Sequence, residues 1–186
     1  PFTYPRFFER WETHEKSQWL PHEVVMSSDV SDWNNRLTET QKDFLTNIFR
    51  FFTQGDVEVA GAYYSEYLPL LGKLPGEAVH IAAYSYLIET IGMPESTYSD
   101  FLKYNEMKEK QDYLRKFSET RQFIGKKNLT VEDKEHIAIS IGLFSGGVEG
   151  IQLFSSFIML LVFPLNGLMK GMSQIITWSI ADETQH

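Results

Sequence analysis

One carboxylate stands alone in the most apolar part of this 186-residue chain. Between His136 and Met169, a span of 34 residues, Glu149 is the only formally charged side chain. The most apolar run, residues 153–165, has 13 residues, fewer than the roughly 20 needed to cross a bilayer, so it predicts a buried helix. An unpaired buried carboxylate is strongly unfavourable. We therefore expect Glu149 to be protonated, ion-paired with a distant Arg or Lys, or metal-bound.

Apolar residues at helical spacing recur along the rest of the chain. Thr38 with Gln41, and Thr130 with Asp133, have the spacing of helix capping boxes. The pattern predicts helices over about 38–71, 77–91, 96–117, 130–163 and 168–186, joined by a polar connector over 118–129 and a turn over 164–167. Residues 1–37, with three prolines, predict an irregular N-terminal arm. The sequence shows no alternating strand pattern and no repeat. We expect an all-α fold with a single domain over 1–186.

Composition excludes several classes of function. The chain has no cysteine, so it offers neither a disulfide framework nor a thiol nucleophile. A formal net charge of −8 argues against nucleic acid or an anionic membrane as a partner. No leader with a cleavage site is visible, and we expect a cytoplasmic protein.

Two acidic residues each share a helix face with a histidine of their own. Glu77 precedes His80, and Glu183 precedes His186, by three residues, which puts each pair on one side of a predicted helix. Either pair alone could arise by chance on a surface, so the pairs are informative only together with acids on other helices.

Single acids on two further helices complete a recognisable layout. A carboxylate from each of two helices, with Glu-x-x-His from each of two others, is the arrangement of di-metal sites in ferritin-like bundles. Such oxygen and nitrogen donors suit iron or manganese. The predicted ligands are Asp56, Glu77, His80, Glu149, Glu183 and His186. Asp56 could instead be a solvent residue. Glu58 and Glu66 are expected to be solvated, and the other histidines to be structural or exposed.

Tyr84 lies four residues after His80, one turn further along the same helix face. An isolated tyrosine on an apolar helix is usually a core residue whose hydroxyl finds an acceptor. Beside metals that activate dioxygen it would be an oxidisable group. Tyr86, two residues on, is expected to point elsewhere.

Five stretches of the chain match one family pattern: Trp19–Val24 in the arm, Phe51–Asp56, Glu77–Tyr84, Glu149–Phe154 and Ala181–His186. Together these stretches resemble the small, radical-generating subunit of class I ribonucleotide reductase. The Tyr84 spacing and the arm residue Trp19 set that family apart from other ferritin-like di-iron proteins. The match covers both ends and the centre of the chain and is poorest over 103–128.

The resemblance implies two metal ions per chain, of iron, manganese or one of each. One would be held by Asp56, Glu77 and His80, and the other by Glu149, Glu183 and His186. Dioxygen would be activated there, a stable radical stored on Tyr84, and the oxidant passed to a large catalytic subunit that makes deoxyribonucleotides. The family also implies a homodimer, with neither nucleic acid nor membrane as a partner.

Further roles follow from the same resemblance. Trp19, Asp182 and His80 match the family's inner radical-transfer relay, in which Asp182 accepts a hydrogen bond from the His80 ring. An apolar pocket that keeps water from the radical is matched by Leu153, Phe157 and Ile176.

Two departures from the family pattern stand out. Asp56 and Glu77 are 21 residues apart, about ten fewer than expected, and a helix running on to residue 71 would end about 22 Å from Asp56. We interpret this as residues omitted near 73–76. The chain also ends at His186, so we expect it to lack the family's later helices and its docking tail.

Three other classes remain open. A different ferritin-like di-metal oxidase or oxygenase would need a substrate cavity beside the metals. An iron-storage bundle would give no role to Trp19 beside Asp182. A metal-free bundle would leave Glu149 unexplained.

Overall fold

The computed structural model describes residues 5–16, 18–62, 78–98, 100–118, 121–123 and 125–184. Every regular element in these ranges is helical, which confirms the all-α prediction. The longer α-helices are α1 (Pro5–Lys16), α2 (Ser27–Asn35), α3 (Glu39–Ala62), α5 (Ala78–Thr90), α6 (Asn105–Ser118), α7 (Val131–Ile141), α8 (Phe154–Leu160) and α10 (Lys170–Glu183). Shorter helical segments are η1 (Pro21–Glu23), η3 (Glu95–Tyr98), η4 (Asp100–Lys103), η5 (Arg121–Phe123) and α9 (Val162–Leu165), and the π-helix η6 (Gly142–Leu153) joins α7 to α8.

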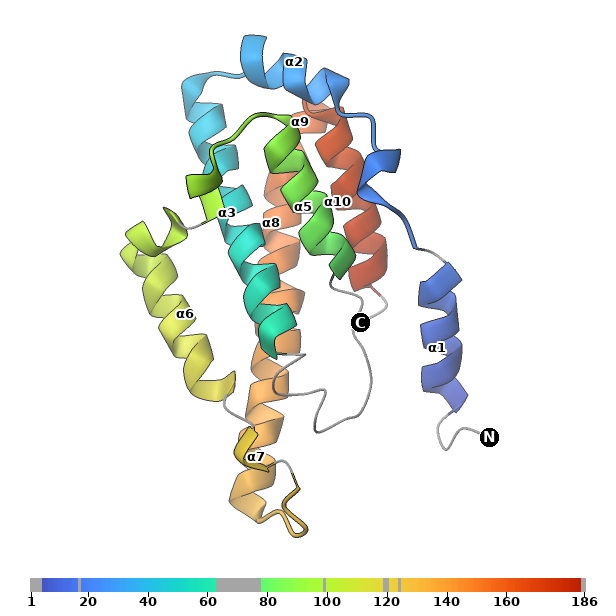
Figure 1. The fold of residues 1–186 in the computed structure, drawn as a ribbon, viewed down its shortest axis with the longest axis vertical. Helices are drawn as coiled ribbons and strands as arrows, with labels where there is room; N and C mark the ends of the chain where they lie inside the picture. The colour runs from blue at the N-terminus through green and yellow to red at the C-terminus, as the bar shows by residue number, and fades with distance from the viewer. Residues whose placement is uncertain are drawn as a thin grey trace.

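Four long helical elements form the bundle. In Figure 1, α3, α5, α8 and α10 run side by side, α6 flanks α3, and α2 crosses one end. Each bundle helix packs on neighbours: α3 on α5, and α10 on α5, α8 and α2. The apolar core between them is made mainly of Leu45, Phe49, Phe52, Tyr84, Leu87, Ile88, Phe157, Leu160, Met172, Ile175 and Ile176.

The predicted helix boundaries have a clear local origin. Thr38 N–H donates to Gln41 Oε1 at 2.9 Å while Gln41 N–H donates to Thr38 Oγ1 at 3.3 Å, a reciprocal capping box that starts α3. Thr130 and Asp133 form the same box before α7. The chain leaves α5 through Gly92, whose φ of 79° suits glycine. These starts and the stop confirm the predictions from spacing.

The helix that carries Glu149 contains an unusual segment. Between α7 and α8 the backbone adopts a π-helix over Gly142–Leu153. This segment holds four glycines, and the Ser145 hydroxyl donates to the Ile141 carbonyl at 2.7 Å. Side-chain bonds of this kind compete with the regular helical ladder, and glycine lowers the barrier to a wider turn. π-Helical turns inside α-helices are frequent at functional sites.

Only one face of this long helix is buried, so the prediction of a buried helix is wrong for the opposite face. Phe157 and Leu160 enter the core, whereas Ile151 is 74% and Leu165 86% exposed. Residues 131–165 are also long and apolar enough to cross a membrane by length and composition alone, with mean hydropathy 1.8 and 33% burial in the most apolar window. The core helix of a bundle meets the same criterion.

The N-terminal region departs from the irregular arm that the sequence predicts. Residues 5–16 form α1, which lies to one side of the bundle, and residues 27–35 form α2, which packs against α10. The stretch between them, from Gln18 to Met26, contains no α-helix and includes the short 3₁₀ segment η1. The prolines are accommodated at helix starts: Pro5 begins α1 and Pro21 begins η1.

Candidate metal centre

The six predicted ligands fall into three groups in the structure. Glu149 and Glu183 are described with their side chains. Asp56 and His80 are described only as backbone in α3 and α5, and their side chains lie outside the described part. Glu77 and His186 lie outside the described residues altogether, as does the segment near 73–76. Among the side chains that are described, no three His, Asp or Glu gather into a cluster. The full ligand set therefore stays a prediction.

The helical elements that carry these residues nevertheless pack against one another, each on the next. The Glu149 segment η6 contacts α3, which carries Asp56, and α3 contacts α5, which carries His80 and Tyr84. In turn, α5 contacts α10, the helix of Glu183. The fold thus brings together the four helical elements on which a di-metal carboxylate layout depends.

Glu149 is buried as the sequence predicts. It is 7% exposed, and its neighbours Val148 and Phe144 form a small buried apolar cluster with Leu114 of α6. Taking a carboxylate out of water into such surroundings is unfavourable unless it is neutralised or bound to a cation. It also lies on a π-helical segment, and such segments are frequent at functional sites.

Two more carboxylates are buried at the last turn of α10. Asp182 is 6% and Glu183 is 8% exposed. The C-terminal end of a helix carries partial negative charge, which disfavours acids there, and the last turn of α10 contains no basic residue. A bound divalent cation would offset both the burial of the two acids and the negative end of the helix dipole. The electrostatics and the oxygen donors therefore fit a metal ion such as iron or manganese.

Tyr84 sits in an aromatic stack in the core. It is 1% exposed, and its ring lies 4.6 Å from the Phe52 ring with an interplanar angle of 4°. The Phe157 ring also stacks with that of Phe52, at 5.5 Å between centroids. The Tyr84 hydroxyl donates to Ser179 Oγ of α10 over 3.5 Å. Tyr86, the comparison residue, is only half-buried.

The apolar residues expected around Tyr84 share one core with it. Phe157 and Ile176 are buried members of that core, and Leu153 packs against it. The sequence reasoning missed two direct neighbours, Phe52 and Ser179. Phe52 lies inside a quoted motif, but a single sequence contains no signal that pairs it with Tyr84.

The predicted proximity of Trp19 and Asp182 is confirmed. Trp19 Nε1–H donates to Asp182 Oδ2 at 2.8 Å in a buried contact between residues 163 positions apart. The Trp19 ring also lies 5.1 Å from that of Trp178 on α10. The expected bond from Asp182 to the His80 ring involves a side chain outside the described part.

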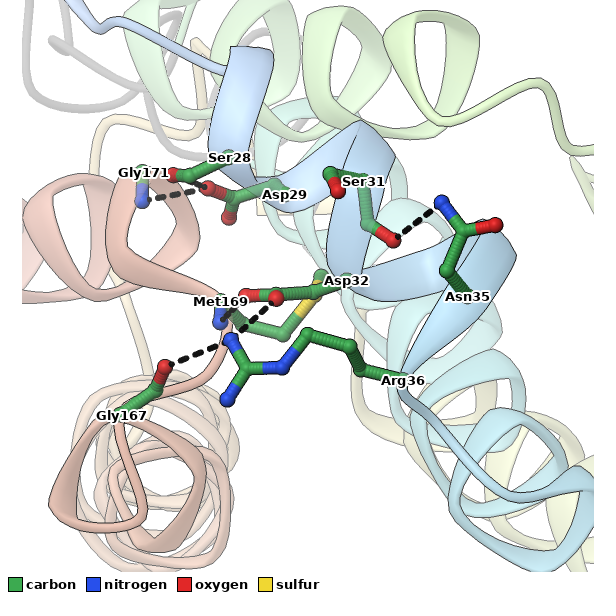
Figure 2. A network of polar contacts seen from close by, with 9 residues as sticks. All are labelled: Ser28, Asp29, Ser31, Asp32, Asn35, Arg36, Gly167, Met169 and Gly171. Atoms are coloured by element: carbon green, nitrogen blue, oxygen red, sulfur yellow. Dashed lines mark hydrogen bonds and ion pairs between the residues drawn. The ribbon is translucent and has the colours of Figure 1, made fainter.

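A second pair of buried acids was also missed. Asp29 and Asp32 of α2 hold the start of α10 by accepting hydrogen bonds from the backbone N–H groups of Met169, Gly171 and Met172. Figure 2 draws the bonds from Met169 and Gly171. In the sequence they look like ordinary polar residues of a serine-rich stretch.

Comparison with known proteins gives a consistent result. The family model described as "Ribonucleotide reductase, small chain" matches residues 1–186. A probable ribonucleoside-diphosphate reductase small subunit of Invertebrate iridescent virus 6 is 65% identical over 198 residues, covering 100% of this chain and 55% of the relative. Its counterpart in Invertebrate iridescent virus 3 is 48% identical, covering 100% of this chain and 53% of that protein. The chain thus spans about half the length of these relatives.

Solved structures share the fold at low sequence identity. The ribonucleotide reductase R2 subunit from Clostridium botulinum has a TM-score of 0.81 at 19% identity, covering 99% of this chain and 59% of that one. An R2-like ligand-binding oxidase from Sulfolobus acidocaldarius has a TM-score of 0.77 at 18% identity, covering 96% and 68%. With the family model matching along its whole length and a relative 65% identical, the chain belongs to the ribonucleotide reductase small-chain family.

Proposed function

We propose that the protein containing this chain is the small subunit of a ribonucleoside-diphosphate reductase. In this role it generates an oxidant and passes it to a large catalytic subunit for deoxyribonucleotide synthesis. The observation that carries the proposal is the buried Tyr84 in its aromatic stack, on a helix packed against the one that presents Asp182 and Glu183. A homodimer in the cytoplasm is the assembly and location we expect.

The proposed metal ligands are the six residues named from the sequence. Glu149 and Glu183 support the assignment because they are buried acids on elements packed into one bundle. Asp56, Glu77, His80 and His186 complete the set. When bound, the metal pair supplies the oxidising equivalents, drawn from dioxygen. Iron, manganese or one of each suits these donors, and related R2-like ligand-binding oxidases have been studied with a Mn/Fe cofactor.

The surroundings of Tyr84 suit storage of a radical. Phe52 covers one ring face, and the residue is sealed from solvent, so water and small reductants have little access. The Tyr84 hydroxyl donates to Ser179 Oγ at 3.5 Å, so an oxygen of α10 lies within reach of the phenolic proton. The chain therefore supplies a dry pocket and a nearby oxygen for a residue that loses an electron and a proton.

Trp19 and Asp182 suit transfer of the oxidant toward a partner. An oxidised indole becomes a strong acid, and Asp182 Oδ2 already accepts its N–H at 2.8 Å. A carboxylate in this position can hold that proton while the electron moves. We propose that this pair lies on the route between the metal centre and the large subunit.

The short spacing between Asp56 and Glu77 fits the same proposal if residues are absent between them. The alignment with the iridescent virus 6 relative runs over 198 positions, against 186 residues here, a difference of 12. We propose that the natural chain carries additional residues near 73–76. These residues would let the chain return from the end of α3 so that Glu77 can lie beside Asp56.

A ligand-binding oxidase is the alternative, and it requires a substrate cavity beside the metals. A cavity of about 360 Å³ does exist in the described part, lined by Phe44, Met159 and Phe163 among others. It lies near the start of α3, about 18 Å along the helix from Asp56. The aromatic packing at Tyr84 favours the reductase role.

The proposal is tested by low-temperature EPR after anaerobic loading with ferrous iron and exposure to oxygen. We expect a tyrosyl doublet in the wild-type chain that is absent in Tyr84→Phe. Tyr86→Phe is the matched control and should keep the signal. Bound metal without any doublet would favour a metal-centred oxidant or the oxidase alternative. A doublet that persists in Tyr84→Phe would refute the role of that residue.

A further inference from the structure

Helix α10 begins without a cap of its own. Met169, the residue before the helix, has the left-handed φ of 53° and supplies no side-chain acceptor. The first amides of a helix need acceptors, which an N-cap Asp or Ser usually provides within the same helix. Here that role falls to Asp29 of α2. Its Oδ2 accepts Gly171 N–H at 2.8 Å, as Figure 2 shows. Its Oδ1 accepts Met172 N–H at 2.7 Å.

Asp32, one turn later on α2, fixes the turn before α10. Its Oδ2 accepts Met169 N–H at 2.8 Å, and its Oδ1 pairs with Arg36 at 2.6 Å. Arg36 also donates to the Gly167 carbonyl at 3.2 Å, as Figure 2 shows. Both carboxylates are buried, so their charge-assisted bonds to the backbone N–H groups around the start of α10 are shielded from solvent competition, whereas the Arg36 side chain is 53% exposed.

The backbones of the two segments touch at Gly171. A Cβ placed there would lie 2.5 Å from Met26 Sδ, 2.9 Å from the Val25 carbonyl oxygen and 3.0 Å from Asp29 Oδ2. The methionine could move aside, but the carbonyl belongs to the backbone. Close approach therefore requires glycine at this position, and the contact sets the distance between α10 and residues 25–29.

The same N-terminal segment holds α10 again at its other end. There the Trp19 indole N–H donates to Asp182. Trp19 precedes Asp29 by ten residues in the N-terminal segment, and Asp182 follows Gly171 by 11 residues in α10. At 1.5 Å per residue, the two attachment points on α10 are about 16 Å apart. A helix fixed at both points cannot slide or rotate without breaking one of them.

We infer that Asp29 is a positioning residue for the buried acids of α10. By capping the helix from outside, it fixes the axial position of α10 and so the distance from Asp182 to the Trp19 indole. The relevance of that distance to electron transfer rests on the proposed function, whereas the mechanical coupling does not. A cap that served stability alone would weaken the fold but leave the Trp19–Asp182 bond as it is.

The test reads that bond in the 186-residue chain without added metal. In protein labelled with ¹⁵N-tryptophan, the Trp19 indole N–H gives one NMR signal, assigned from its loss in Trp19→Phe. In Asp29→Ala we expect this signal to move toward the position of an exposed indole. The Gly171 and Met172 amides, followed in uniformly labelled protein, should exchange about tenfold faster or more. Asp43→Ala, at an exposed acid on α3, is the control and should leave all three signals unchanged.

Asp29→Asn covers the case in which the alanine variant does not fold. It keeps one acceptor oxygen and the side-chain volume, so we expect a smaller displacement in the same direction. An unmoved indole signal in a folded Asp29 variant whose Gly171 and Met172 amides exchange faster would overturn the inference. Failure of the proposed function gives a different pattern, in which the wild-type chain yields no tyrosyl radical while the Asp29 variants still displace the Trp19 signal.

Discussion

Substitution of Phe52 by leucine tests the aromatic packing around Tyr84. Phe52 is almost fully buried on α3, and its ring stacks with those of Tyr84, at 4.6 Å, and Phe157, at 5.5 Å. Leucine keeps much of the apolar burial but removes the two stacked ring contacts, together with a tilted contact to Phe51 at 5.8 Å, and leaves part of the ring volume empty. The change therefore isolates the stack from the general hydrophobic contribution of the site.

The expected loss follows from the two stacked contacts. An aromatic pair contributes about 0.5–1.5 kcal/mol beyond the area that it buries. Loss of two pairs predicts about 2 kcal/mol for Phe52→Leu, below the roughly 3–5 kcal/mol typical of truncating a buried Phe to alanine. For a chain of this size, about 2 kcal/mol corresponds to a decrease in Tm of roughly 4–8 °C.

Urea unfolding followed by circular dichroism measures the loss, with the tyrosine region of the near-UV spectrum as a second signal. Phe44→Leu on the same helix is the matched control, because Phe44 is 41% exposed and its stacking contact with Phe163 is longer, at 6.2 Å. We expect less than about 1 kcal/mol there. If Phe52→Leu costs no more than Phe44→Leu, or leaves the tyrosine signal unchanged, the stack does not hold Tyr84.

Three further substitutions probe other contacts. Asp182→Asn should weaken the charge-assisted bond to Trp19 and lower the free energy of unfolding by about 1–2 kcal/mol, whereas no change in urea unfolding would mean that the bond is absent in solution. Gly171→Ala should lower the free energy of unfolding by about 1–3 kcal/mol despite the better helix propensity of alanine, because its Cβ would clash with the N-terminal segment at Met26. A more stable variant would contradict this. Burial lowers the pKa of Lys110 from 10.5 to about 8, so the charged lysine destabilises the fold fully below pH 8, and stability rises as the pH increases toward 10.5. After allowance for partial exposure, this rise in the free energy of unfolding is about 1 kcal/mol, and Lys110→Met should remove it. Urea midpoints at pH 7 and pH 10 measure the rise, and an unchanged pH dependence in the variant would contradict the pKa shift.

Local signals predicted most of the fold. The capping boxes at Thr38 and Thr130 and the glycine at 92 act within a few residues, so spacing alone located those helix ends. Helix α2 escaped prediction because its sequence, SSDVSDWNN, is rich in poor helix formers. As a helix, α2 presents Asp29 and Asp32 to backbone N–H groups at the start of α10, and a single sequence does not reveal these tertiary hydrogen bonds.

The candidate site divides in the same way. Burial of Glu149 followed from its isolation in an apolar stretch, and the contact of Trp19 with Asp182 followed from the family resemblance. Phe52 and Ser179 were missed as neighbours of Tyr84 because they come from other helices, and their proximity depends on how α3 and α10 pack against α5.

The number of metal ions bound per chain tests the central claim most directly. Anaerobic equilibrium dialysis against Fe(II), followed by elemental analysis, should give two ions per wild-type chain. Glu149→Ala should lose at least one of them while its circular dichroism spectrum remains helical, and the control Glu135→Ala, at an exposed acid on α7, should keep both. A wild-type chain that binds no metal, or a Glu149→Ala variant that retains two ions, would contradict the assignment of this bundle as a di-metal centre.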